Sequence, residues 1–146
     1  MYSDILIPLD LSHKEQAEEL AAVAGKLAAG EQARLHLLYV DQSFIHRASY
    51  PQLDESELTG HKSDAQQQMK YLLTDLAKNL ELVIHCRNGT AHDQILESAA
   101  ELDVDAIVMM ARKPGISSYF IGSNAERVVR HAPCSVFVIR SENSNS

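Results

Sequence analysis

The sequence contains no tryptophan, and aromatic residues make up only 5% of its 146 residues. Single-stranded nucleic acids are commonly bound by stacking their bases on aromatic side chains, so this scarcity argues against such a platform. The chain also lacks an excess of positive charge. Its formal net charge is -7, whereas binding to DNA or RNA depends on a positive surface that displaces phosphate counterions. We therefore expect no nucleic-acid partner, although Arg127, Arg130 and His131 leave room for a local basic patch.

Cysteine is scarce as well: Cys86 and Cys134 lie far apart and form neither a CxxC pair nor a Cys/His ligand cluster. This usage is typical of buried thiols in a reducing compartment. The N-terminal segment lacks the basic region and the apolar core of a signal peptide. No apolar run approaches the roughly 20 residues that a membrane-spanning helix needs. These absences predict a cytoplasmic protein without a membrane partner.

Several motifs that carry chemistry are also missing. The chain has no GxxxxGK(S/T) phosphate-binding loop and no GxGxxG sequence after its first predicted strand. A phosphoacceptor receiver domain needs an aspartate at the end of its third strand, where this chain reads Cys86-Arg87-Asn88-Gly89. The seven histidines show no metal-binding spacing. Because no general base or metal cluster is evident, we expect no rapid catalysis and no bound structural metal.

What the sequence does contain is a regular alternation of apolar runs and amphipathic segments. The apolar runs predict five strands, at residues 5–9, 34–40, 82–86, 106–110 and 135–139. The segments between them predict four helices, over about 12–30, 62–80, 90–102 and 123–132, with capping boxes opening the first and the last. Strict alternation implies a parallel sheet covered on both faces. Right-handed crossovers then restrict this α/β fold to a doubly wound sheet.

Ligands of doubly wound sheets bind beyond the carboxyl ends of the strands, where the strand order reverses. Asp10 ends the first strand, and its carboxylate can accept hydrogen bonds from ribose hydroxyls. The alternative is an acid that serves only the following helix or loop. Val40 ends the second strand, where free backbone groups can pair with an adenine edge. The side chain of Asp41 is better interpreted as a solvated loop acid.

Gly122 and Ser123 open the last predicted helix. A helix N-terminus offers unpaired N–H groups and partial positive charge to an anion, and glycine lets a phosphate approach the backbone. Arg112 and Lys113 in the preceding loop can add positive charge, although such side chains are usually only solvated. The alternative is that Ser123 serves as a helix N-cap and nothing more.

Three segments give the chain a resemblance to the universal stress protein family. They are the opening strand and aspartate at residues 5–10, the glycine turn and helix start at 88–96, and the run at 122–136. The resemblance implies a flavodoxin-like, five-stranded parallel sheet of order 3-2-1-4-5, with a family domain over 1–140. The polar composition of residues 141–146 separately predicts a disordered tail. The resemblance also implies a homodimer that pairs through the fifth strand (Val136, Val138), with a tetramer as an alternative.

Nucleotide-binding members of that family carry a Gly-x2-Gly-x9-Gly-Ser/Thr pattern after the fourth strand. Here only its last part is present, as Gly122-Ser123; the earlier glycines are replaced by Met109 and Arg112, or by Met110 and Lys113 in a shorter loop. The chain is similar to a subgroup with a shortened basic-proline loop and a Gly-Ser-Asn helix start. The nucleotide site implied by the resemblance comprises Pro8, Leu9, Asp10, Val40, Met110, Arg112, Lys113, Gly122, Ser123, Asn124 and Ser135.

The resemblance thus implies a stress-response or signalling module that binds ATP, or ADP or AMP, with Mg²⁺ accompanying the triphosphate and at most slow ATP hydrolysis. The missing glycines favour an alternative, a nucleotide-free dimeric interaction protein of the same fold. A third interpretation is an adenylating α-hydrolase of related fold. It is disfavoured because the sequence has neither an early glycine-rich phosphate loop nor a His-x-Gly-His motif.

Overall fold

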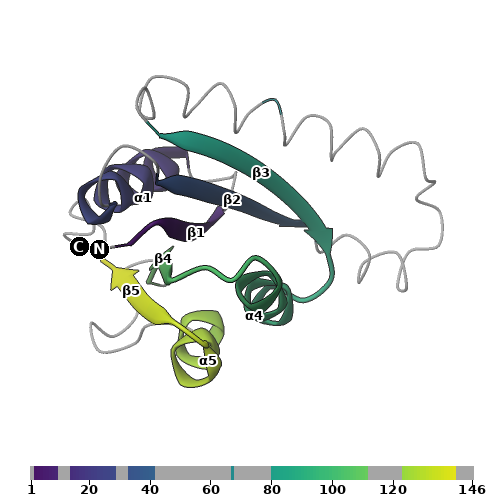
Figure 1. Ribbon diagram of the computed structural model, residues 1–146. Helices are drawn as coiled ribbons and strands as arrows, with labels where there is room; N and C mark the ends of the chain where they lie inside the picture. The colour runs from purple at the N-terminus through teal and green to yellow at the C-terminus, as the bar shows by residue number, and fades with distance from the viewer. Residues whose placement is uncertain are drawn as a thin grey trace.

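The computed structural model describes residues 2–9, 14–28, 33–41, 67, 80–111 and 123–140. All strand pairs in its five-stranded sheet are parallel, and the strand order is β3-β2-β1-β4-β5. The strands are β1 (Asp4–Leu9), β2 (Arg34–Asp41), β3 (Glu81–Asn88), β4 (Ala106–Met110) and β5 (Ser135–Ile139). The helices are α1 (Lys14–Leu27), α4 (Ala91–Glu101) and α5 (Ser123–His131). This arrangement confirms the predicted doubly wound α/β sheet (Figure 1).

Two predicted segments lie outside the described residues. The polar tail over 141–146 is one of them. The other is the helix predicted over about 62–80, of which only Gln67 and Leu80 are described; Gln67 is helical and exposed. Among the helices that the structure describes, none is long and apolar enough to cross a membrane.

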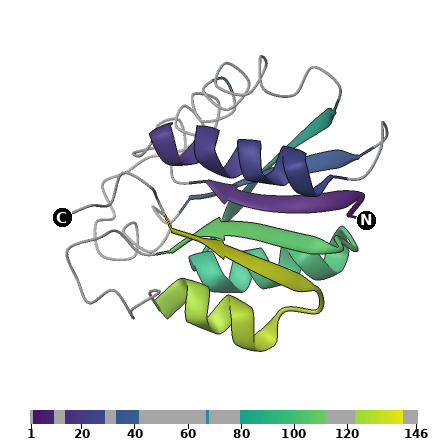
Figure 2. The ribbon, with the colours of Figure 1, turned by 90° about the vertical axis from the view of Figure 1, so that its left-hand side faces the viewer.

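Helices cover both faces of the sheet, with α1 on one face and α4 and α5 on the other (Figure 2). Successive residues of a strand point to opposite faces. In β1, for example, Ile5 and Ile7 pack in the cluster beneath α1, whereas Leu6 packs with residues of α4 and α5. All three side chains are fully buried. Burial on both faces explains why the strands read as continuous apolar runs in the sequence.

Proline in the middle of a sheet usually removes a hydrogen bond, yet Pro8 lies within β1 and is aligned with Leu38 of β2. The pairing of β1 with β4 covers only Ile5 and Leu6. Pro8 therefore lies beyond the end of the β1–β4 ladder, towards the end of its strand. Such a position near a strand end, where one neighbour no longer pairs, is one that a sheet tolerates for proline.

Gly89 makes the turn from β3 into α4, and its φ of +136° is one that side-chain-bearing residues rarely adopt. An added Cβ would lie 2.9 Å from Nε2 of Gln94. The flexible end of Gln94 can move away, but the backbone dihedral cannot relax so cheaply. Gly89→Ala is therefore expected to lower the free energy of unfolding by about 1–3 kcal/mol, as measured by urea denaturation.

Gly25 provides the matched control for this substitution. It is exposed in α1, and an added Cβ would meet no atom within 4 Å. Gly25→Ala should raise the free energy of unfolding by about 0.4–1 kcal/mol, because alanine restricts the unfolded chain. Two glycine substitutions that changed stability in the same direction would contradict the role given to the Gly89 turn.

Candidate nucleotide site at the carboxyl edge of the sheet

The switch in strand order lies between β1 and β4: the chain adds β2 and β3 on one side of β1, then β4 and β5 on the other. The crevice beyond the carboxyl ends of two such strands is where doubly wound folds bind ligands. In Figure 2, α5 begins on the left, where β5 ends, and β5 begins on the right, near the N-terminus. The N-terminus of α5 therefore lies at the carboxyl edge of the sheet, as the sequence predicted.

Four predicted site residues lie at the carboxyl ends of the three strands next to this switch. Pro8 and Leu9 are the last two residues of β1, Val40 is the residue before the end of β2, and Met110 is the last residue of β4. Leu9 is buried, whereas the other three are half-buried. The structure thus brings these residues to one edge. Asp10, Arg112, Lys113 and Gly122 lie outside the described residues.

Ser123 and Asn124 are exposed at the start of α5. Ser123 is the first residue of the helix. A capping box requires the serine to precede the helix, so Ser123 lies one position inside the predicted N-cap position. The next turn buries Ala125 and Val128 against the sheet. Packing of this apolar side fixes the orientation of α5 and leaves its first backbone N–H groups directed toward the edge.

His92 of α4 was not among the predicted site residues, yet it contacts two residues of α5. Its Nδ1 lies 3.3 Å from Oδ1 of Asn124, and its Nε2 lies 3.0 Å from Nη1 of Arg127. A carbonyl oxygen only accepts and a guanidinium only donates, so Nδ1 of His92 donates to Asn124 and Nε2 accepts from Arg127. The carboxylate of Asp93 lies 3.3 Å from the same Nε2.

The bridge through His92 joins the N-terminal turns of α4 and α5. Its residues are 32 and 35 positions apart along the chain, so no local spacing in the sequence could have revealed it. The only available signal was that both helices begin after strands of the same parallel sheet, whose carboxyl ends share one edge. With Oδ1 of Asn124 engaged by His92, the amide N–H groups of Asn124 remain as donors to a ligand.

Ser135 lies at the other edge of the sheet. It is the first residue of β5 and is aligned with Ala106, the first residue of β4. The hydroxyl of Tyr2, which precedes β1, donates to Oγ of Ser135 at 3.3 Å. Parallel strands all begin at the same edge, so Ser135 is a full strand length away from the start of α5. The structure does not bring Ser135 to the other predicted site residues.

Val136 and Val138, the predicted dimer residues, are half-buried and pack in the cluster beneath α4 and α5. Their side chains therefore face this subunit's own core. β5 lies at one end of the sheet order and pairs with β4 on one side. Any pairing with a second copy would accordingly use the backbone of β5 more than these two side chains.

Comparisons with known proteins give one consistent result. The model of the universal stress protein family matches residues 1–140. Universal stress protein G of Escherichia coli O157:H7 is 30% identical to this chain over 146 residues, covering 96% of this chain and 100% of that protein. Solved structures also share the fold at lower identity, and two of them are in complex with an adenine nucleotide.

The first is the universal stress protein from Archaeoglobus fulgidus in complex with dAMP. It superposes with a TM-score of 0.68 and is 19% identical to this chain, and the match covers 94% of this chain and 98% of that one. The second is a universal stress protein in complex with cAMP. It superposes with a TM-score of 0.64 and is 16% identical to this chain, and the match covers 97% of this chain and 98% of that one.

Proposed function

Because the chain belongs to the universal stress protein family, we propose that it binds an adenine nucleotide (ATP, ADP or AMP) and acts as a cytoplasmic stress-response or signalling module. The observation that carries this proposal is the exposed N-terminus of α5 at the switch point of the sheet, with Asn124 held by His92. Two proteins of this fold have been solved with the adenine nucleotides dAMP and cAMP.

The proposed site divides the nucleotide among the strand ends. Asp10 takes the ribose, and the backbone at Val40 pairs with the adenine. The first N–H groups of α5 at Ser123 and Asn124 hold the phosphates, because a helix N-terminus combines free donors with partial positive charge. The amide of Asn124 adds a side-chain donor whose direction His92 fixes. Arg112 and Lys113 supply further positive charge from the loop before the helix.

We propose that any hydrolysis of ATP at this site is slow. Within the described part of the chain, no group of three or more His, Cys, Asp and Glu side chains can hold a metal ion. Mg²⁺ would then enter on the oxygens of the triphosphate, without a dedicated cage of protein ligands. Nucleotide binding would act by favouring one conformation or one assembly of the protein over another.

Calorimetric titration of the metal-free protein with ATP, with and without added Mg²⁺, tests the proposal directly. We expect micromolar binding for the wild-type protein and loss of that binding for Gly122→Val, because a branched side chain would block close approach of a phosphate to the helix start. Absence of heat and of any thermal shift at millimolar ATP would reject nucleotide binding. Turnover at the rate of a typical enzyme would reject the role of a binding module.

The missing early glycines support a second candidate, a nucleotide-free dimeric interaction protein. Side chains at Met110 and Lys113, or at Met109 and Arg112, make close approach of a triphosphate harder than glycine would. In this version β5 pairs across a two-fold axis with β5 of a second copy. Sedimentation of the wild-type protein would show a dimer whose stability does not change with ATP.

A further inference from the structure

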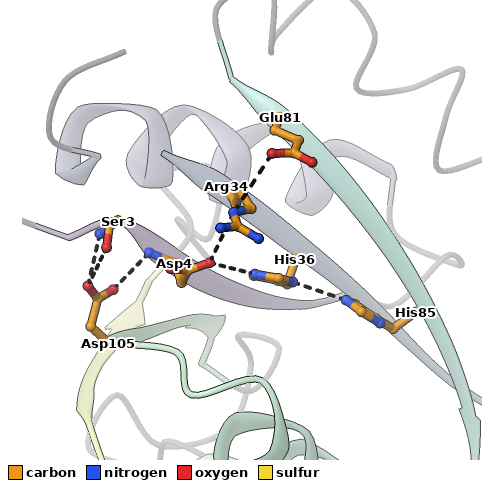
Figure 3. Close-up of polar contacts among 7 residues, drawn as sticks. All are labelled: Ser3, Asp4, Arg34, His36, Glu81, His85 and Asp105. Atoms are coloured by element: carbon orange, nitrogen blue, oxygen red, sulfur yellow. Dashed lines mark hydrogen bonds and ion pairs between the residues drawn. The ribbon is translucent and has the colours of Figure 1, made fainter. Parts of the chain in front are cut away.

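Three titratable side chains, Asp4, His36 and His85, are joined in a row by hydrogen bonds. The row lies on the α4 side of the sheet, away from the candidate nucleotide site. Asp4 is the first residue of β1, His36 belongs to β2 and His85 to β3. Oδ1 of Asp4 lies 3.0 Å from Nε2 of His36, and Nδ1 of His36 lies 3.0 Å from Nε2 of His85. The two rings are stacked with their centroids 5.3 Å apart. Figure 3 shows the three residues in a row across three strands.

The carboxylate of Asp4 fixes where the protons lie in this row. A carboxylate only accepts, so Nε2 of His36 donates to it. In the neutral His36 ring, Nδ1 then carries no proton and accepts from Nε2 of His85. Two neutral imidazoles therefore satisfy every hydrogen bond in the row. Because His36 is buried, loss of either bond would leave an unsatisfied polar group in the interior.

One extra proton fits into the row, but two do not. When His36 gains a proton, its Nδ1 becomes a donor, and His85 keeps the bond by moving its own proton to Nδ1 and accepting at Nε2. The charged His36 remains compensated by Asp4. When both rings are protonated, two N–H groups point at each other across 3.0 Å, and two positive charges meet with no hydrogen bond between them.

The charged groups around the row favour this limit of one proton. Nε of Arg34 lies 3.6 Å from Oδ1 of Asp4 and 3.7 Å from Oε2 of Glu81. The carboxylate of Asp4 is therefore shared between His36 and the Arg34 guanidinium. Asp105 accepts from the backbone of Ser3 and of Asp4. Burial raises the pKa of Asp105, but the hydrogen bonds from Ser3 and Asp4 outweigh it, and the pKa lies below its usual value. Asp105 therefore stays ionised and holds the backbone of β1 in place.

On the other side of His85, Arg87 of β3 interacts with α4. Its Nη1 donates to Oγ of Ser98 at 3.0 Å and lies 3.9 Å from Oε2 of Glu97. Its Nη2 forms an ion pair with Oε2 of Glu101. Burial lowers the pKa of His85 below its ordinary value of 6.5, and the charges of His36 and Arg87 lower it further. Near neutral pH, therefore, His85 is the uncharged donor that the row requires.

We propose that Asp4, His36 and His85 form a proton-responsive latch that holds the edge strand β3 to β2 and β1 and yields in mildly acidic conditions. The native row binds at most one proton, whereas a form with β3 detached from β2 binds one on each ring. Protons therefore favour opening below the ordinary histidine pKa of about 6.5. The stability that the latch contributes is fully present above this pH and is lost as the pH falls through the lowered pKa of His85.

Hydrogen exchange of the intact protein at pH 7.5 and pH 5.5 tests the latch. After correction for the chemical exchange rate, the equilibrium constant for opening of β3 amides should be about tenfold larger at pH 5.5 than at pH 7.5. This is the limit when the open form binds one more proton than the closed form, with a pKa of about 6.5. Amides of β5 serve as the internal reference. Unchanged protection of β3 relative to β5 would overturn the proposal.

Two variants separate the latch from a general response to acid. His85→Gln keeps a donor for Nδ1 of His36 but cannot titrate, so it should lose the pH-dependent opening of β3. His131→Gln removes an exposed histidine at the end of α5 and should keep it. Equal pH dependence in wild type and His85→Gln would overturn the proposal.

Nitrogen-detected NMR of the histidine rings gives a readout that needs no variant. At pH 8, the expected state is a proton on Nε2 of both His36 and His85. On acidification, the pair should take up a single added proton, with the proton of His85 moved to its Nδ1. Full protonation of both rings in a protein whose β3 remains protected would show that the row does not act as a latch.

Discussion

Replacing Ser123 with aspartate should weaken ATP binding by about thirtyfold while leaving the fold intact. A carboxylate at the start of α5 would lie beside the proposed phosphate position. Repulsion between two unit charges at 4 Å amounts to about 1 kcal/mol even at the dielectric constant of water. Two such phosphate charges reduce the affinity by about 2 kcal/mol, or roughly thirtyfold. The same carboxylate interacts favourably with the helix dipole, so stability should not fall.

Ser135→Asp is the matched control for this experiment. It introduces the same charge at a serine that is also exposed, but at the opposite edge of the sheet. ATP affinity, measured by calorimetry at two salt concentrations, should be nearly unchanged in this variant. The loss in Ser123→Asp should be larger at low salt, because salt screens charge repulsion. Equal losses in the two variants would place the nucleotide somewhere other than the start of α5.

Replacing Ile107 with alanine should lower the free energy of unfolding by about 2–5 kcal/mol. Ile107 is fully buried in β4, a central strand paired with β1 on one side and β5 on the other. Its side chain packs in the cluster beneath α4 and α5. Alanine would leave a cavity between the sheet and two helices that the rigid sheet cannot close. Urea denaturation should show a lower midpoint with an unchanged slope.

Ile139→Ala makes the same chemical change at the end of the edge strand β5. Ile139 is only half-buried, so less apolar surface returns to water and the neighbouring chain can relax. Its effect should be less than half of that at Ile107. If the two substitutions were equally costly, Ile139 would have to be covered by something beyond this subunit's own core, such as a second copy paired along β5.

Much of the fold was accessible from the sequence, because its signals are local. Apolar runs such as 106–110 are continuous since parallel strands are buried on both faces, and all five predicted strands are present within about two residues of their predicted bounds. Their alternation with helices and the handedness of the crossovers predicted a doubly wound sheet. The order 3-2-1-4-5 came from the family resemblance, and the structure confirms it.

For the site, the sequence by itself located the strand ends to within about two residues and the start of α5. Its interpretation of Asp41 as a solvated loop acid was wrong, because Asp41 is the buried last residue of β2. The sequence did not determine which residues meet, because contacts across a sheet or between helices have no fixed spacing along the chain. Only the tertiary structure placed His92 against Asn124 and Arg127, and Ser135 at the far edge beside Tyr2. His36 and His85 read as separate histidines 49 residues apart. They become a pair that limits proton uptake only because parallel pairing places β2 beside β3 with both rings on the same face.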